Sequence, residues 1–224
     1  MRNEHFFLFF GLLFSSTWAN AQNELQVIPT FSGVPIELTR PYSLSETDSI
    51  QFETIKFYIS NITLTNGLGN DVSPAERYYL IDLANQSSQH IALPSYDQFT
   101  HITFDLGIDS ITNVSGAMEG ALDPTNGMYW TWQSGYINLK LEGTSSACPA
   151  RNHFFQYHLG GYQFPNNALQ TIQLDFSDHK YQLFLPLDNF FQSANLMDKY
   201  EVMRPCEEAV HLSVLTGSLF NTKL

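Results

Sequence analysis

The apolar positions of this chain recur mostly with a period of two, in short runs separated by polar and glycine-rich connections. Within residues 51–64, five apolar side chains occupy odd-numbered positions first and even-numbered positions afterwards. They are Ile55, Phe57 and Ile59, followed by Ile62 and Leu64. A bulge near Ser60 and Asn61 would keep both sets on one face of a strand. Further strands are predicted at 24–31, 78–83, 98–106, 134–141, 152–159, 169–176 and 181–186. This spacing predicts an all-β fold, an antiparallel β-sandwich or barrel.

Two short helices are expected beside the strands. Residues 187–191 form the first, with Asp188 as its capping residue. The segment after the last proline carries Glu207 and Glu208 in its first turn, followed by apolar residues at helical spacing, and Gly217 is expected to end it. We expect this C-terminal helix to pack on one end of the sandwich.

The N-terminus indicates the compartment. Arg2 precedes an apolar run at 6–14, and Ala19-Asn20-Ala21 is a small-x-small cleavage site. We therefore expect residues 1–21 to be a signal peptide and residues 22–224 to be a single β domain that is periplasmic or secreted. The apolar run is too short to span a bilayer, and no cysteine lies at the cleavage point, so no membrane anchor is expected.

The net charge of the chain limits the kinds of molecule that it is expected to bind. Lys and Arg number 10 against 22 Asp and Glu, which gives a net charge of -12. Nucleic acid and anionic membranes are poor partners for such a chain, whereas cationic partners and metal ions would be attracted. There is no G-x-S-x-G motif, P-loop or dinucleotide-binding glycine pattern, so the chain is not expected to be an enzyme.

Two cysteines, Cys148 and Cys206, remain in the mature chain. An even count in an oxidising compartment favours a disulfide between them. The alternative is a two-thiol metal site, but the pair lacks the close C-x-x-C spacing typical of one.

The stretch 122–143 concentrates the aromatic residues. Its beginning, 123–127, has the composition of a turn, which would deliver Trp130 and Trp132 into a strand on one shared face. Further along, a single apolar face is predicted from Ile137, Leu139 and Leu141. Two neighbouring indoles are costly to leave in water, so they either fill a core or build a site.

Six histidines follow the cleavage site, and they lie in five separate segments. They are His90, His101, His153, His158, His179 and His211. A metal site would therefore have to be assembled by the fold. His153 and His158 are five residues apart, so in one regular strand they would point to opposite faces and could not share an ion. Met118 and Met128 are possible thioether ligands on either side of the central turn, although methionine more often fills gaps in a core.

Several of these segments carry a family resemblance. The run Met128-Tyr129-Trp130-Thr131-Trp132-Gln133-Ser134-Gly135-Tyr136, the later Lys140-Leu141-Glu142-Gly143, and Phe155-Gln156-Tyr157-His158-Leu159-Gly160-Gly161 resemble the MbnP family. The resemblance extends to residues 57–61 and 104–109. That family consists of periplasmic copper-binding proteins often encoded beside di-haem, MauG-like partners. One departure is that many relatives have an Asn-His pair where this chain has Asn113 and Val114.

The resemblance implies copper as the bound cofactor and a di-haem MauG-like protein as partner. It implies that a tryptophan, Trp130 or Trp132, is oxidised to kynurenine and helps to bind the metal. It selects His158 as a copper ligand, with His101 as a second candidate. The chain would then be a copper carrier or redox partner and the substrate of a tryptophan-oxidising enzyme.

Two other functions stay open from the residues alone. In the first, an aromatic platform binds a carbohydrate or peptide; it would consist of Tyr129, Trp130, Trp132 and Tyr136. In the second, the protein is a structural exported domain with both tryptophans buried.

Overall fold

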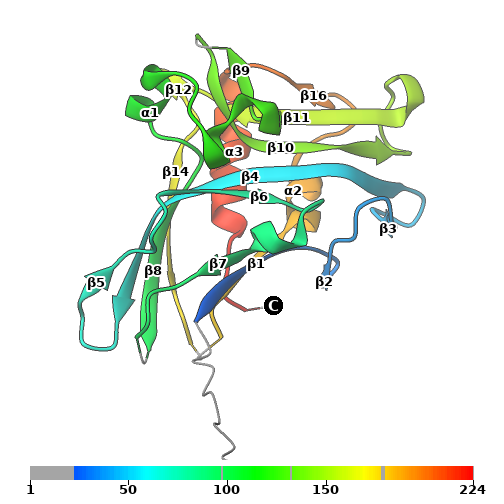
Figure 1. Ribbon diagram of the computed structural model, residues 1–224. Coiled ribbons are helices and arrows are strands. Elements are labelled where there is room, and N and C mark those ends of the chain that lie inside the picture. The colour runs from blue at the N-terminus through cyan, green and yellow to red at the C-terminus, as the bar shows by residue number, and fades with distance from the viewer. Residues whose placement is uncertain (1–22, 97, 132, 178–179, 224) are drawn as a thin grey trace, which may run out of the picture.

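The computed structural model describes residues 23–96, 98–131, 133–177 and 180–223. These residues form a large curled sheet, a smaller sheet that packs on it, and short helices (Figure 1). The central strands of the large sheet follow the order β14-β8-β4-β10-β11-β16, with β3, β5 and β6 paired to β4 and β9 paired to β10. The expected β-sandwich with a few short helices is confirmed. Most strand pairs are antiparallel, but β1–β15 and β11–β16 are parallel.

The strands of the large sheet are β3 (Pro41–Ser43), β4 (Ser49–Asn66), β5 (Asp71–Val72), β6 (Tyr78–Asp82), β8 (Phe99–Leu106), β9 (Tyr129–Thr131), β10 (Gly135–Ser145), β11 (Phe154–Gly160), β14 (Gln170–Asp175) and β16 (Glu201–Val202). The smaller sheet contains β1 (Glu24–Phe31), β2 (Val34–Pro35), β7 (His90–Ala92) and β15 (Gln182–Pro186). A separate hairpin is formed by β12 (Tyr162–Gln163) and β13 (Asn166–Asn167).

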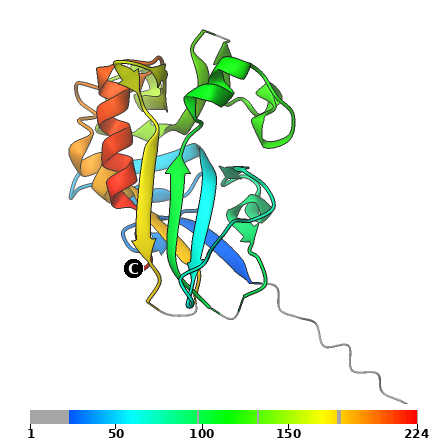
Figure 2. The ribbon, with the colours of Figure 1, turned by 90° about the vertical axis from the view of Figure 1, so that its left-hand side faces the viewer.

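The helices are α1 (Ser110–Ser115), α2 (Leu187–Ser193) and α3 (Glu207–Leu219), and single 3-10 turns lie at η1 (Gln86–Gln89), η2 (Gly120–Leu122), η3 (Pro124–Asn126) and η4 (Arg151–His153). Helix α3 packs against β11 and β14, and Figure 2 shows it running alongside β14. Among the described residues, no helix combines the length and the apolar character needed to cross a membrane.

The long strand β4 organises the large sheet and contains the predicted bulge. Its register against β8 shifts between Ser60 and Thr63, and Asn61 has a φ of 51°. The shift keeps the apolar residues on either side of it in the main core between the sheets; these are Ile55, Phe57, Ile59, Ile62 and Leu64. The change of parity in the sequence therefore had the expected structural cause.

The helices differ from expectation in three respects. Helix α2 begins where predicted, but its N-cap is Pro186 and no side chain caps it, so the capping role expected for Asp188 is wrong. Helix α3 continues through Gly217, where a Cβ would lie 3.1 Å from Cβ of Gln170. The glycine thus permits close packing against β14 rather than ending the helix. Helix α1 was not predicted at all.

The apolar face expected along β10 is also divided. Leu139 and Leu141 belong to the main core, but Ile137 belongs to a second apolar cluster. The register between β10 and β11 shifts between Ile137 and Leu139, which turns the beginning of β10 away from the main core.

Candidate functional site

A second apolar cluster lies on the side of the large sheet away from the main core. Its buried members are Tyr58, Ile108, Leu122, Met128, Tyr136 and Ile137, and Tyr78, Leu80, Tyr129 and Trp130 pack against them. The segment 116–128 supplies Leu122 and Met128, and β9 supplies Tyr129 and Trp130. Helix α1 and β9 lie at the same end of the molecule (Figures 1 and 2). The aromatic stretch singled out in the sequence therefore has a small core of its own.

Tyr136 holds the segment 116–128 in place. Its side chain is 1% exposed, and its hydroxyl lies 3.1 Å from the Met118 amide, 3.2 Å from the Gly116 carbonyl and 3.0 Å from the Leu122 carbonyl. Burial raises the pKa of Tyr136. A tyrosine so enclosed is not available to stack on a ligand, so the platform proposed from the sequence would lack one of its four rings.

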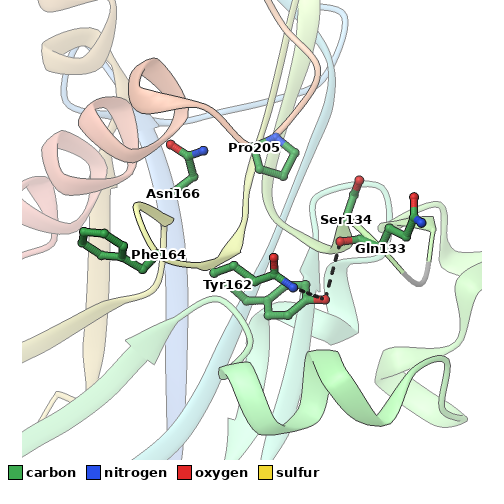
Figure 3. Close-up of a pocket in the computed structure, with 7 residues that line it drawn as sticks. Gln133, Ser134, Tyr162, Phe164, Asn166 and Pro205 are labelled. Carbon is green, nitrogen blue, oxygen red and sulfur yellow. Dashed lines mark hydrogen bonds between the residues drawn. The ribbon is translucent and has the colours of Figure 1, made fainter.

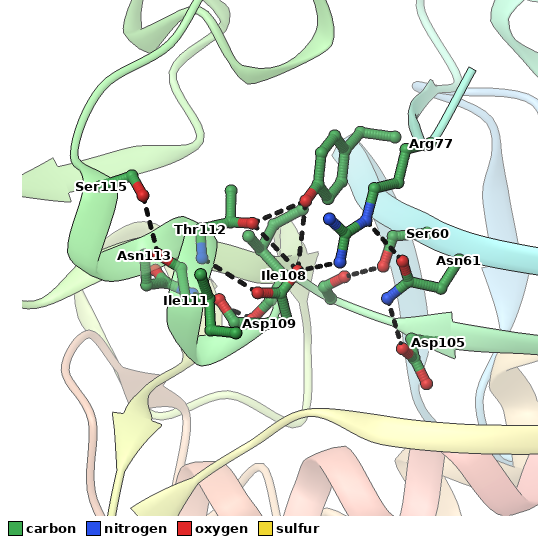
Figure 4. A network of polar contacts seen from close by, with 12 residues as sticks. Ser60, Asn61, Arg77, Asp105, Ile108, Asp109, Ile111, Thr112, Asn113 and Ser115 are labelled. Carbon is green, nitrogen blue, oxygen red and sulfur yellow. Dashed lines mark hydrogen bonds and ion pairs between the residues drawn. The ribbon is translucent and has the colours of Figure 1, made fainter.

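Helix α1 is attached to the sheet by a polar network (Figure 4). Asp109 caps it by accepting a hydrogen bond from the Thr112 amide at 2.9 Å, and it forms an ion pair with Arg77 at 3.1 Å. Arg77 also donates to Asn61, which in turn donates to Asp105 at 2.7 Å. The bulge in β4 therefore supplies an anchor for helix α1.

Asn113 connects α1 to the strand after the tryptophans. It is 2% exposed, its Nδ2 donates to the carbonyls of Ile108 and Asp109, and its Oδ1 accepts from the Tyr136 amide at 2.8 Å. The next residue, Val114, is 72% exposed on the outside of the helix. Asn113 thus has a structural role in this chain, and position 114 faces solvent.

A small pocket lies where the β9–β10 connection meets the β12–β13 hairpin (Figure 3). Its lining residues are Gln133, Ser134, Tyr162, Gln163, Phe164, Asn166 and Pro205. Its volume is about 120 Å³, below the roughly 300–1,000 Å³ typical of small-molecule sites. None of these side chains is a histidine, cysteine or carboxylate, so the pocket is a poor candidate for the copper site.

Trp130 lies in β9 with its six-membered ring against Gly160 of β11. A Cβ on Gly160 would come within 2.9 Å of Cζ3 and 3.2 Å of Cη2 of that ring. The indole is half-buried, and its Nε1 is buried without a hydrogen-bond partner among the described residues. An unpaired buried donor costs about 1–3 kcal/mol of folding free energy. A ligand or a chemical change that gave this nitrogen a partner would recover that free energy.

His158 lies on the same side of β11 as the Trp130 ring. Its neighbours Tyr157 and Leu159 belong to the main core, so alternation places His158 and Gly160 together on the opposite face. Two residues span about 7 Å along a strand. The imidazole of His158 therefore projects from the face of the sheet on which the Trp130 ring lies, two residues along β11 from the contact of that ring with Gly160.

The His158 ring has two differently occupied nitrogens. Nε2 lies 2.7 Å from Oε1 of Glu142 on β10, whereas Nδ1 is buried and has no hydrogen-bond partner among the described residues. The side chain is 7% exposed, and that of Glu142 is 22% exposed. The bond from His158 lowers the pKa of Glu142 to about 2, in spite of burial, and Thr54 and Lys140 act in the same direction.

The other candidates lie elsewhere. His101 is in β8, bonded to Asp175 at 2.7 Å, and roughly 20 Å along the strand from Gly107, which borders the second cluster. His153 precedes β11 and has a φ of 58°, so the parity argument does not apply to it.

Trp132 and His179 lie outside the described residues. Of the two methionines, Met128 is fully buried in the second cluster and Met118 is 45% exposed.

Both cysteines are free thiols in the structure. Cys148 is buried and its Sγ lies 3.2 Å from the Phe154 carbonyl, and Cys206 precedes α3. The structure does not show the expected disulfide, and the pairing stays a prediction.

The residues present meet only part of the needs of a metal. Within the described ranges, no three His, Cys, Asp or Glu side chains gather closely enough to hold an ion. A buried imidazole nitrogen with a free lone pair does suit copper, and its ring is backed by a carboxylate, as metal-binding histidines usually are. His158 thus fits as one ligand of a metal site. The other ligands of that site would not be His, Cys, Asp or Glu side chains of the described residues.

A family model for MbnP matches residues 20–204, which is most of the chain. The chain belongs to the MbnP family. The solved structure of MbnP from Methylosinus trichosporium is similar in fold, with a TM-score of 0.57 and 14% sequence identity over 84% of this chain and 86% of that one. No curated protein sequence matches this chain. The MbnP match places both Trp130 and His158 inside the family region.

Sequence reasoning missed Glu142 as part of the site. Glu142 stands in the family-like Lys140-Leu141-Glu142-Gly143 run, but its partner depends on how β10 pairs with β11. Lys140 is opposite His158 and Glu142 is opposite Gln156, so Glu142 reaches His158 diagonally. The sequence signal was limited to an acidic residue directly after a predicted strand, two positions from Lys140.

Proposed function

We propose that this protein is an exported copper-binding protein whose metal is bound beside the β9 strand, with Nδ1 of His158 as a ligand. The observation that carries the proposal is the environment of His158. One ring nitrogen is bonded to a carboxylate, and the other is buried with no partner among the described residues, on the face of the sheet that carries the Trp130 ring. Membership of the MbnP family supports copper as the metal. Imidazole nitrogen is a favourable donor for copper.

A second donor would come from an oxidised tryptophan. Oxidative opening of an indole between C2 and C3 adds one oxygen atom to each carbon, which gives a ketone at C3 and a formamide on the ring nitrogen. Hydrolysis of the formamide releases C2 as formate and leaves an aryl amine. The amine and the ketone are the donors of kynurenine. Trp130 and Trp132 are the two candidates in the mature chain. The unpaired Nε1 of Trp130 is the atom that would become the amine, and it lies on the face that carries His158.

The oxidising equivalents would come from a di-haem MauG-like partner, so this protein would be that enzyme's substrate rather than an enzyme itself. Export fits the small-x-small cleavage site before residue 22 and the apolar run at 6–14. The net charge of -12 would favour the capture of a metal cation.

The proposal is tested on protein isolated from its native exported fraction. Intact and peptide mass spectrometry would locate any kynurenine, and elemental analysis of the same sample would measure copper. The matched control is the same chain produced without the di-haem partner. We expect kynurenine at Trp130 or Trp132 and bound copper in the native sample, and unmodified tryptophans in the control. Unmodified tryptophans and no copper in the native sample would contradict the proposal.

A further inference from the structure

Glu142 and His158 form a partly buried pair that fixes the direction in which the imidazole presents its lone pair. The distance from Nε2 to Oε1 is 2.7 Å, and both side chains project from neighbouring strands on the face that carries the Trp130 ring. An ionised carboxylate only accepts hydrogen bonds, so the proton of the pair lies on Nε2.

The surroundings of the other nitrogen, Nδ1, disfavour a hydrogen on it. A proton on Nδ1 would leave a buried donor without an acceptor, because Nδ1 has no partner among the described residues. The neutral imidazole with its hydrogen on Nε2 instead leaves Nδ1 with a lone pair, which is the form that binds metals.

Glu142 is itself held from two sides. Thr54, its neighbour across the β4–β10 pair, hydrogen-bonds to it, and the charge of Lys140 lies close by. Lys140 also donates from Nζ to the Gly127 carbonyl at 2.8 Å, just before the strand of Trp130. The carboxylate is therefore fixed with respect to both β4 and the connection that leads into β9.

We propose that Glu142 is a positioning residue: it holds His158 as the Nε2–H tautomer and aims Nδ1 at the metal site beside Trp130. The inference rests on the proposed function for the identity of the metal. The hydrogen bond from His158 to Glu142, however, exists in the metal-free protein, so its effect on the tautomer can be measured without metal.

The test uses metal-free protein labelled with ¹⁵N in histidine, with the tautomer of His158 read from long-range ¹H–¹⁵N correlations. Three proteins are compared: the wild type, Glu142→Gln, which keeps an oxygen acceptor, and Glu142→Leu, which removes it. We expect His158 to be the Nε2–H tautomer in the first two and a mixture in Glu142→Leu. The matched control is Asp175→Leu, which removes the carboxylate beside His101 and should leave His158 unchanged.

Copper affinity of the same proteins, measured by competition with a chelator, completes the test. We expect Glu142→Leu to bind copper about 10–100-fold more weakly, with Glu142→Gln in between and Asp175→Leu unchanged. An Nδ1–H tautomer in the wild type, or the same tautomer and affinity in Glu142→Leu as in the wild type, would overturn the positioning role. If the tautomers behave as expected but the wild type binds no copper, the proposed function is wrong. The conclusion that Glu142 sets the tautomer of His158 would still be supported.

Discussion

Gly160 lies so close to the six-membered ring of Trp130 that no larger residue fits between them. An added Cβ would be 2.9 Å from the ring and 2.6 Å from the Tyr136 carbonyl. The glycine of the family-like His-Leu-Gly-Gly run therefore provides the space that the indole occupies, two residues beyond His158. This contact places the indole on the same face of the sheet as the imidazole.

Gly160→Ala should displace Trp130. We expect the free energy of unfolding in urea to fall by about 1–3 kcal/mol, because overpacking forces side chains and backbone to shift. Copper affinity should fall as well. Gly67→Ala is the matched control, since Gly67 has an ordinary φ and no atom within 4 Å of its added Cβ. If both variants were equally stable and bound copper equally well, the close contact would be unimportant.

Asn113→Ala should loosen helix α1 from the strand after the tryptophans. It would leave the Tyr136 amide and the Ile108 carbonyl unpaired, and we expect the free energy of unfolding to fall by about 2–3 kcal/mol. Ser115→Ala on the exposed side of the same helix should change it by less than about 0.5 kcal/mol. Chemical denaturation of both variants provides the comparison, and equal midpoints would argue against the anchoring role of Asn113.

The cap of α1 should make stability depend on pH. Burial would raise the pKa of Asp109, but hydrogen bonds from Thr112 and Tyr78 and the charge of Arg77 outweigh it and hold that pKa below its usual value near 3.8. The ionised carboxylate therefore stabilises the fold above about pH 4, and this contribution is lost as the pH falls through the lowered pKa.

Asp109→Asn keeps a capping oxygen but does not titrate. We expect the difference in free energy of unfolding between the wild type and Asp109→Asn to shrink as the pH is lowered below 3.8. Denaturation curves collected at several acidic pH values measure it. A difference that stayed constant across this range would show that the charge of Asp109 contributes nothing.

Much of the fold could be predicted from alternation in the sequence, because most long strands bury one face in the main core. The bulge in β4 was predictable since two apolar sets of opposite parity had to share that core. Helix α1 was not, because its six residues are too few to show a helical period and its stability depends on Asp109, Asn113 and their distant partners.

The site was predictable only in part. The family-like motifs indicated His158 and the tryptophans, but the tie between His158 and Glu142 depends on the register of β10 against β11. A register shift also moved Ile137 into the second cluster, contrary to the face predicted from its parity with Leu139. Pairing between strands far apart in the sequence is set by the whole sheet, so local patterns do not reveal it.

The most direct test of the account is the copper affinity of His158→Ala beside that of His101→Ala, each measured by chelator competition on protein carrying its native modification. The two variants remove one imidazole each, both bonded to a carboxylate, but only His158 lies on the strand and the face that the Trp130 ring contacts. We expect the loss of affinity in His158→Ala to exceed the roughly 10–100-fold typical of outer partners, with no change in His101→Ala. Wild-type affinity in a folded His158→Ala protein would contradict the assignment of the copper site.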